Sequence, residues 1–110
     1  MLRRRDAYVP DLISWEDLHL DKSSCELSCG DQRIRLTGKM YQLMELFMEN
    51  PRHLFSAQQL MDKVWGWESE AEINVVWVNI SQLRKKLGEL GSDTEIRVIR
   101  GTGYALEKKA

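Results

Sequence analysis

Apolar residues recur at helical spacing in the segment that follows residue 37. One stripe ends before Asn50-Pro51 and consists of Met40, Leu43, Met44 and Phe47. A second helix is predicted to begin at Ser56, which has the spacing of a capping box with Gln59, and to end at Gly66. The pattern therefore predicts two consecutive helices with a short connection between them.

A third helix is predicted over about residues 73–87, with Gly88 and Gly91 at its end. Laid out at about 100° per residue, its apolar face consists of Val76, Ile80, Leu83 and Leu87. Val78 lies almost opposite, among the polar residues Asn74, Ser81, Gln82 and Lys85. Because a helix face that meets only solvent is expected to be polar, Val78 is either a neutral substitution or part of a contact surface.

Three stretches before the first helix alternate between apolar and polar residues and predict a small antiparallel meander. They read LISWEDLHLD, SCELSC and DQRIRLT, and turn-prone residues at 22–24 and 30–31 separate them. The predicted buried side consists of Leu12, Trp15, Leu18, Leu20, Leu27, Ile34 and Leu36. After the third helix, a two-stranded hairpin around a turn at 100–103 is predicted from Ile96, Val98, Tyr104 and Leu106.

The length of 110 residues fits one domain with a single modest core. Residues 1–10 have the character of a linker, which leaves residues 11–110 as the domain. No stretch reaches the ~18–20 apolar residues of a membrane span, so a cytoplasmic protein is expected. Cys25 and Cys29 are the only cysteines and have no histidine near them in sequence, which predicts reduced thiols, no metal site and no cofactor.

The charge is distributed unevenly along the chain. A net charge of −1 argues against a nucleic-acid partner, because DNA-binding domains are usually basic. However, residues 1–73 carry 9 Lys and Arg against 13 Asp and Glu, whereas residues 74–110 carry 7 against 4. The third helix and the hairpin thus form a basic end, which a solvated surface would also show.

Five short motifs occur in order along almost the whole chain. They are LT before the first helix, NP after it, S..QL...VWG, V.V.ISQLRKKL and IRVIRGTGYAL. Together they resemble the OmpR/PhoB-type effector domain of two-component response regulators. The resemblance implies an α+β winged helix-turn-helix fold with a four-stranded antiparallel N-terminal sheet, a three-helix core and a C-terminal hairpin, the wing.

The resemblance also implies a function, namely sequence-specific binding of promoter DNA as the output domain of a transcriptional response regulator. The implied partners are double-stranded promoter DNA, a receiver domain of the same protein that this sequence lacks, its sensor kinase, and RNA polymerase through the loop 66–72. The chain departs from the family at Met40, where Glu is usual, so no capping box is expected at Thr37. It also has Trp77 for a usual Asp, and Asn79 and Gln82 where His and Arg are frequent.

In this interpretation the third helix enters the major groove and the wing the minor groove. The expected DNA-binding residues are Trp65, Asn74, Val78, Asn79, Ser81, Gln82, Arg84, Lys85, Lys86, Arg100 and Thr102. Gln82 has the amide that pairs with adenine, and Arg100 begins the Gly-rich tip of the wing. Ser81, Lys85 and Lys86 are better placed for phosphates.

Several of these residues have a plainer alternative. Asn74 and Asn79 fit either a base or a phosphate, and Arg84 lies nearer the edge of the core. Trp65 suits a core tryptophan as well as a phosphate donor, Arg100 suits a solvated charge, and Trp77 is expected to pack rather than to function.

The residues also bear on two other classes of function, an enzyme and a protein-binding module. The sequence has no Ser/His/Asp set, no Gly-rich phosphate loop after a strand and no HExxH-like pair, so an enzyme is not expected. A winged helix that binds protein rather than DNA is the alternative, because the charge is nearly neutral and Val78 is apolar.

The residue Val78 provides a direct test of which surface is used. If its side chain meets the C5-methyl group of a thymine, Val78→Ser keeps the fold and weakens preference at one T position of the selected duplexes by about 1 kcal/mol. Selection of bound sequences from a random duplex pool measures this. Unchanged selectivity would mean that the valine is a neutral substitution.

Overall fold

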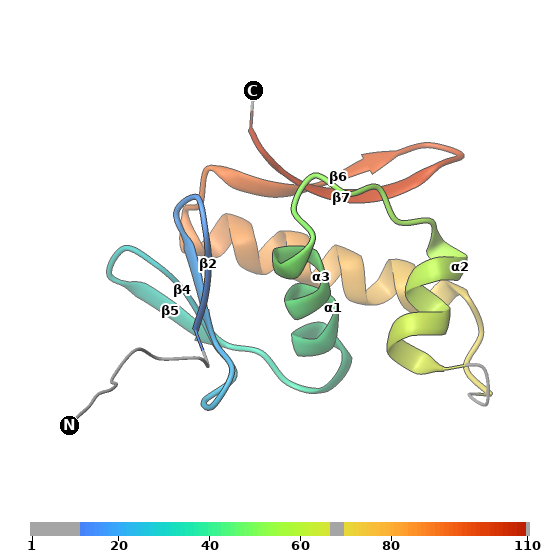
Figure 1. Ribbon diagram of the computed structural model, residues 1–110, viewed down its shortest axis with the longest axis horizontal. Helices are drawn as coiled ribbons and strands as arrows, with labels where there is room; N and C mark the ends of the chain where they lie inside the picture. The colour runs from blue at the N-terminus through green and yellow to red at the C-terminus, as the bar shows by residue number, and fades with distance from the viewer. Residues whose placement is uncertain (1–11, 67–69, 110) are drawn as a thin grey trace.

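The fold is described by a computed structural model in which residues 12–66 and 70–109 are placed (Figure 1). The elements follow in the order expected for a winged helix. A four-stranded antiparallel sheet contains β2 (Leu12–Trp15), β3 (Leu18–Asp21), β4 (Glu26–Cys29) and β5 (Gln32–Arg35) in sequence order. The helices are α1 (Gly38–Glu49), α2 (Ala57–Leu60) with the π-helical turn η1 (Met61–Trp65), and α3 (Asn74–Leu90). The hairpin consists of β6 (Thr94–Ile99) and β7 (Gly103–Lys108), and the predicted linker at 1–10 lies outside the described residues.

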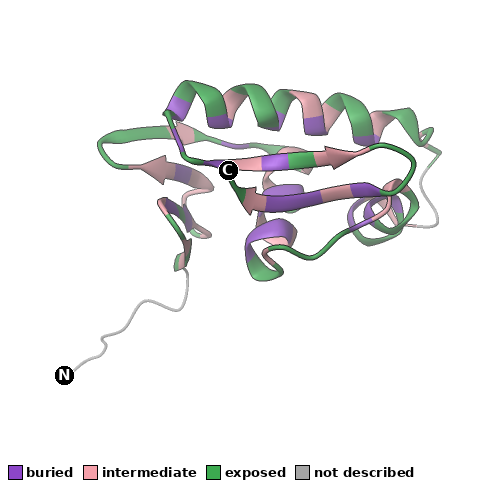
Figure 2. Ribbon diagram, turned by 90° about the horizontal axis from the view of Figure 1, so that it is seen from above, coloured by how far each residue is buried: buried purple, intermediate pink, exposed green. Residues whose placement is uncertain are grey.

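One core joins the sheet, the helices and the hairpin. Its fully buried residues come from every layer and include Leu18, Leu20, Leu27, Leu36, Leu43, Phe47, Ile80, Leu83, Ile96 and Leu106. Figure 2 shows the buried residues of α3 on the side that faces the rest of the molecule and the exposed ones along its outer side. The predicted division of this helix into two faces is therefore confirmed. None of the helices within residues 12–66 and 70–109 has the length and apolar character to cross a membrane.

The three stretches read from the alternation were one strand short, whereas the four strands implied by the resemblance are present, and one burial prediction was wrong. The stretch LISWEDLHLD forms two strands, β2 and β3, that turn at Glu16 and Asp17. Leu12, predicted to be buried, is 47% exposed on β2, which is the outermost strand of the sheet among the described residues. Glu16 has a positive φ of 52°, a conformation that a non-glycine residue adopts only when its surroundings hold it there.

The helix boundaries follow the predicted signals except at two places. The capping box is present, because the Ser56 N–H donates to Gln59 Oε1 and the Gln59 N–H donates to Ser56 Oγ. Thr37 makes no side-chain cap hydrogen bond, as expected. The second helix changes to π-helical hydrogen bonding at Met61 before it ends at Gly66, which was not predicted.

The predicted end of the third helix was right at Gly91 and wrong at Gly88. α3 continues through Gly88 to Leu90 and ends at Gly91, which has a φ of 72° and donates to the carbonyls of Gly88 and Leu87. Leu90 is only 5% exposed. Burial of one more leucine contributes about 1.5–3 kcal/mol, which exceeds the cost of about 1 kcal/mol for an interior glycine.

Asp17 joins the N-terminal sheet to the segment that links α3 to the hairpin. Its Oδ1 accepts from Ser92 Oγ at 2.7 Å and from Thr94 Oγ1 at 3.0 Å, and its Oδ2 accepts from the Asp93 N–H at 2.8 Å. The free thiol of Cys29 also donates to Asp17, at 3.4 Å. Burial by itself raises the pKa of Asp17, but these hydrogen bonds to the charged form outweigh it and lower the pKa to about 2. Burial and the neighbouring Asp17 raise the pKa of Cys29.

The pKa of Asp17 predicts how stability depends on pH. Because the folded pKa is below the unfolded one, the stabilisation is complete above pH ~4 and disappears as the pH falls towards ~2. Between pH ~5 and ~2 the free energy of unfolding of the wild type should fall by about 1–2 kcal/mol more than that of Asp17→Asn. Urea denaturation at a series of pH values measures the difference. Asp31→Asn, at an exposed carboxylate of the β4–β5 turn, is the control, and equal pH dependence in all three proteins would contradict the prediction.

Candidate nucleic-acid interface

The hairpin is attached to the helices through backbone hydrogen bonds. The Phe55 N–H donates to the Tyr104 carbonyl and the Tyr104 N–H donates to the Phe55 carbonyl, each at 2.8 Å. The Arg52 N–H donates to the Leu106 carbonyl, also at 2.8 Å. The segment between α1 and α2 thus pairs with β7 and holds the hairpin beside the helices.

Gly103 lies where this approach is closest. A Cβ atom on Gly103 would be 2.0 Å from the Phe55 carbonyl oxygen and 2.7 Å from its carbonyl carbon. Both atoms belong to the backbone, which cannot move aside without breaking the pairing. Only glycine therefore fits at this position. Gly101, at the tip of the same hairpin, has open space around it and a φ of 75°.

The outer face of α3 carries the side chains that the sequence predicts for contact with bases. Asn74, Val78 and Gln82 are exposed, and Val78 is 49% exposed although it is apolar. Asn79 is half-buried, and its Nδ2 donates to the Val75 carbonyl one turn earlier at 2.9 Å. The amide of Asn79 therefore keeps its Oδ1 acceptor and one of its two N–H donors, but the bond to Val75 fixes its orientation, unlike that of the exposed Gln82.

The predicted cations lie at two places on α3 and the hairpin. Arg84 and Lys85 line a groove beside the base of the hairpin, with Thr94, Glu95 and Lys109, whereas Arg100 lies at its tip. Arg84, Lys85 and Arg100 are exposed, whereas Lys86 and Ser81 are half-buried. No acidic side chain within residues 12–66 and 70–109 forms an ion pair with any of these four cations. By contrast, Lys22 pairs with Glu45 and Glu49. Cations left without partners are suited to bind an anionic ligand.

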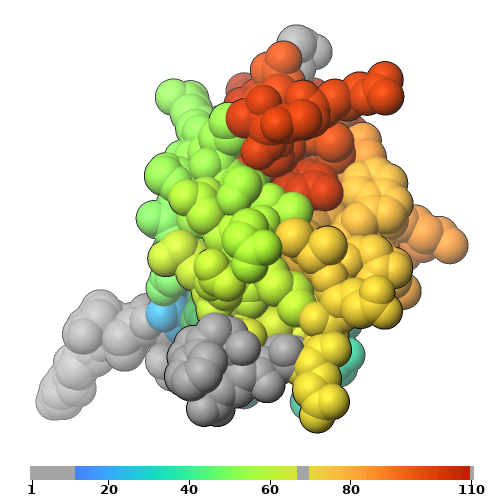
Figure 3. Space-filling view, turned by 90° about the vertical axis from the view of Figure 1, so that its right-hand side faces the viewer, coloured from blue at the N-terminus to red at the C-terminus, as the bar shows by residue number. Residues whose placement is uncertain are grey.

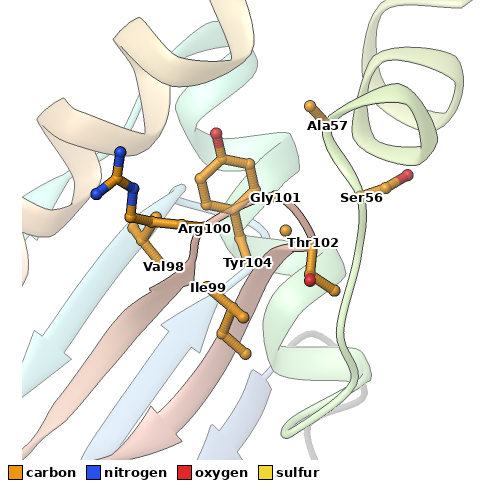
Figure 4. A pocket seen from close by; sticks show the side chains of 9 residues that line it. Ser56, Ala57, Val98, Ile99, Arg100, Gly101, Thr102 and Tyr104 are labelled. Atoms are coloured by element: carbon orange, nitrogen blue, oxygen red, sulfur yellow. The ribbon is translucent and has the colours of Figure 1, made fainter.

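The tip of the hairpin and the start of α2 form a shallow groove. It is lined on one side by Arg100, Gly101 and Thr102 and on the other by Ser56 and Ala57. Figure 4 shows Arg100 and Tyr104 on the side of the hairpin that faces α3. Figure 3 shows the hairpin, the start of α3 and the α2 segment together on one face.

Trp65 was expected either to pack in the core or to donate to a phosphate, and its position is compatible with both. Its side chain is half-buried and packs against the core. The Nζ of Lys39 lies 5.9 Å from the centre of its ring and donates to the Val64 carbonyl at 3.1 Å. Cation–π attraction to Lys39 and contacts with the core thus both hold the ring of Trp65 in place. A contact of Trp65 with phosphate stays a prediction.

An aromatic pair that sequence reasoning missed connects α3 to the hairpin. The rings of Trp77 and Tyr104 are stacked, with centroids 6.5 Å apart and an interplanar angle of 25°. Trp77 packs as expected, but on the hairpin rather than in the core, and it remains 46% exposed. Helical spacing places Trp77 beside Val78 and away from the centre of the apolar stripe, but it does not show the partner on the hairpin.

The chain is similar to known transcriptional regulators over most of its length. Residues 31–106 match the family described as "Transcriptional regulatory protein, C terminal". The heme response regulator HssR of Staphylococcus epidermidis is 32% identical over 108 residues, and the response regulator ArlR of Staphylococcus saprophyticus is 36% identical over 108 residues. Each alignment covers 98% of this chain and 48% of the relative, so the chain spans about half the length of these curated relatives.

A solved structure supports the same relationship. The DNA-binding domain of the response regulator AdeR, solved in complex with an intercistronic region, has a TM-score of 0.75 and 25% sequence identity. The match covers 86% of this chain and 98% of that domain. The winged-helix fold class predicted from the sequence is thereby confirmed.

The contact at Gly103 predicts unequal effects of two alanine substitutions in one hairpin. Gly101→Ala should cost about 1–2 kcal/mol through its positive φ alone. Gly103→Ala should cost more, about 3 kcal/mol, because its Cβ also displaces the Phe55 backbone. Thermal denaturation measures both, and amide hydrogen exchange at Phe55 and Tyr104 should rise only in Gly103→Ala. Equal losses in the two variants would contradict the close approach.

Proposed function

The chain belongs to the family of C-terminal domains of transcriptional regulatory proteins, the DNA-binding domains of response regulators, and on this premise we propose that α3 reads promoter DNA from the major groove. The observation that carries the proposal is the outer face of α3, where exposed polar residues and Val78 are bordered by cations that lack acidic partners among the described residues. A major groove admits one helix, and this is the helix face that the core leaves free.

Two residues on this face are proposed to read bases. The exposed amide of Gln82 pairs with the N6 and N7 edge of adenine, a contact worth about 1–3 kcal/mol of discrimination. Val78, one turn earlier on the same face, contacts the methyl group of thymine. Asn74 and the free Oδ1 of Asn79 lie on either side of them and contact a base or a phosphate. The DNA sequence that α3 prefers therefore contains A·T pairs.

The remaining residues are proposed to bind the backbone and the minor groove. Arg84, Lys85 and Lys86 contact phosphates together with Ser81, which positions the helix without reading sequence. Arg100 enters the adjacent minor groove from the tip of the wing, and Thr102 contacts the backbone beside it. Trp65 is proposed to donate its indole N–H to a phosphate while its ring stays packed against the core and beside Lys39.

The partners of the whole protein are part of the same proposal. The chain spans about half the length of its curated relatives, so a receiver domain and a sensor kinase are proposed from the family. Contact of the loop 66–72 with RNA polymerase is also proposed, although residues 67–69 lie outside the described residues. A cytoplasmic location and the absence of catalytic activity are expected from the family and stay predictions.

One observation favours the alternative, a winged helix that binds a protein. Ile73, Trp77 and Val78 are each between 46% and 49% exposed, and exposed apolar residues in one region often mark a protein interface. The net charge of −1 also suits it. Salt separates the two functions, because only a polyanion releases many counterions when cations bind it.

The dependence of binding on salt tests the proposal. The affinity for a duplex selected from a random pool should fall steeply with salt, and Lys85→Ala combined with Lys86→Ala should reduce the slope of log K against log salt by about 2. Lys22→Ala, which removes a cation paired with Glu45 and Glu49, should leave the slope unchanged. Fluorescence anisotropy over a salt series measures all three proteins. If neither selected nor random duplexes bind at low salt, the proposal is wrong and the protein-binding alternative is supported.

A further inference from the structure

Trp77 and Tyr104 form an exposed aromatic contact between two elements that the proposed function assigns to different grooves. The rings stack with their centroids 6.5 Å apart, and 46% of Trp77 remains accessible to solvent. Trp77 comes from α3 and Tyr104 from β7. A large ring that is half-exposed after it has stacked still has apolar surface to bury against a further partner.

The position of Trp77 on α3 is on the flank towards the hairpin. At about 100° per residue it lies about 100° from Val78, on the side where Tyr104 contacts it. Arg84, seven residues later, is on the same flank, and Arg100 lies at the tip of the hairpin. Neither arginine has an acidic partner within the described part of the chain. The aromatic pair is therefore bordered by cations at both ends.

The geometry of a duplex indicates which part of the DNA would face the side of α3 towards the hairpin. If α3 occupies a major groove and the wing the adjacent minor groove, the strand that separates the two grooves runs between α3 and the wing. The surface between α3 and the wing is the one that Trp77 and Tyr104 form. An indole offers this strand an apolar face for the deoxyribose and one N–H donor for a phosphate oxygen.

We propose that the Trp77–Tyr104 pair is an uncharged contact with the sugar–phosphate strand between the two grooves, and that it sets the position of α3 relative to the wing on DNA. The proposal rests on the DNA-binding function proposed above and adds to it a contact that binds phosphate without a cation. Continuity with the face of α3 and the flanking arginines favours DNA over a protein as the occupant. Trp77 is thus a positioning residue that holds the register of the duplex and reads no base.

An uncharged backbone contact has a signature in binding measurements. Trp77→Ala should lower the affinity about tenfold for both the selected duplex and a scrambled duplex, because the strand backbone is common to both. The slope of log K against log salt should stay that of the wild type, since no counterion is released by an indole. Trp77→Phe, which keeps a ring and loses the N–H donor, should show a smaller loss.

Matched variants separate a lost backbone contact from other causes of a lower affinity. Leu12→Ala removes a side chain that is as exposed as Trp77 but lies on the N-terminal sheet, and its affinity should equal that of the wild type. Gln82→Ala should lose affinity for the selected duplex only, because it reads a base. If Trp77→Ala also loses affinity for the selected duplex only, the indole reads a base and the backbone assignment is wrong.

A spectroscopic readout keeps the proposal testable if Trp77→Ala loosens the hairpin. Incorporation of 5-fluorotryptophan places a fluorine on each of the four tryptophans, and the Trp77 resonance is identified by its absence in Trp77→Phe. On addition of the selected duplex, this resonance should shift and lose its sensitivity to exchange of H2O for D2O, because the indole leaves water. If the duplex binds with its salt dependence intact and the resonance does not change, this inference is wrong while the DNA-binding function stands. If no duplex binds, the proposed function itself fails.

Discussion

The position of the wing depends on one backbone contact, the pairing of Phe55 with Tyr104. Two hydrogen bonds of 2.8 Å hold the strand of the wing against the segment between α1 and α2, and only a glycine at 103 allows the approach. The side chain of Tyr104 stacks on Trp77 of α3. One residue therefore ties the wing to two helices at once, through its backbone on one side and its ring on the other. The spacing between the outer face of α3 and the wing tip follows from these two contacts.

The other end of the hairpin is held by a polar cluster in addition to the apolar packing of Ile96 and Leu106 in the core. Asp17, in the turn between β2 and β3, accepts hydrogen bonds from Ser92, Asp93 and Thr94, which connect α3 to β6. Ser92 and Thr94 are almost fully buried, and the carboxylate satisfies their hydroxyl groups. The N-terminal sheet thus supports the base of the hairpin while Phe55 supports the region of its tip. Because the hairpin is held at both ends, the positions of the cations on it are fixed relative to α3.

The near-neutral charge of the chain and its proposed anionic partner are reconciled by where the charges pair. Lys22 of the N-terminal half is neutralised by Glu45 and Glu49, and Arg97 of the hairpin by Glu107. The cations of the outer face of α3 and Arg100 of the wing tip have no acidic partner among the described residues. A net charge sums over the whole molecule, whereas a duplex meets only one face of it, so the distribution decides binding more than the total.

The order of the elements, the two faces of α3 and the hairpin turn were predictable, because helical and strand periodicity and turn chemistry depend on residues close together in sequence. The family motifs also pointed to the surface on which the candidate site lies. The turn at Glu16-Asp17, the extension of α3 past Gly88 and the stack of Trp77 on Tyr104 were not predictable. Asp17 is of a type common in turns but Glu16 is not, and the hydrogen bonds that hold the turn reach Asp17 from residues 75 to 77 positions later. The sequence by itself determined most of the residues that face the core, with Leu12 as an exception. The tertiary structure decided which exposed residues meet, because those contacts join segments that only the folded chain brings together.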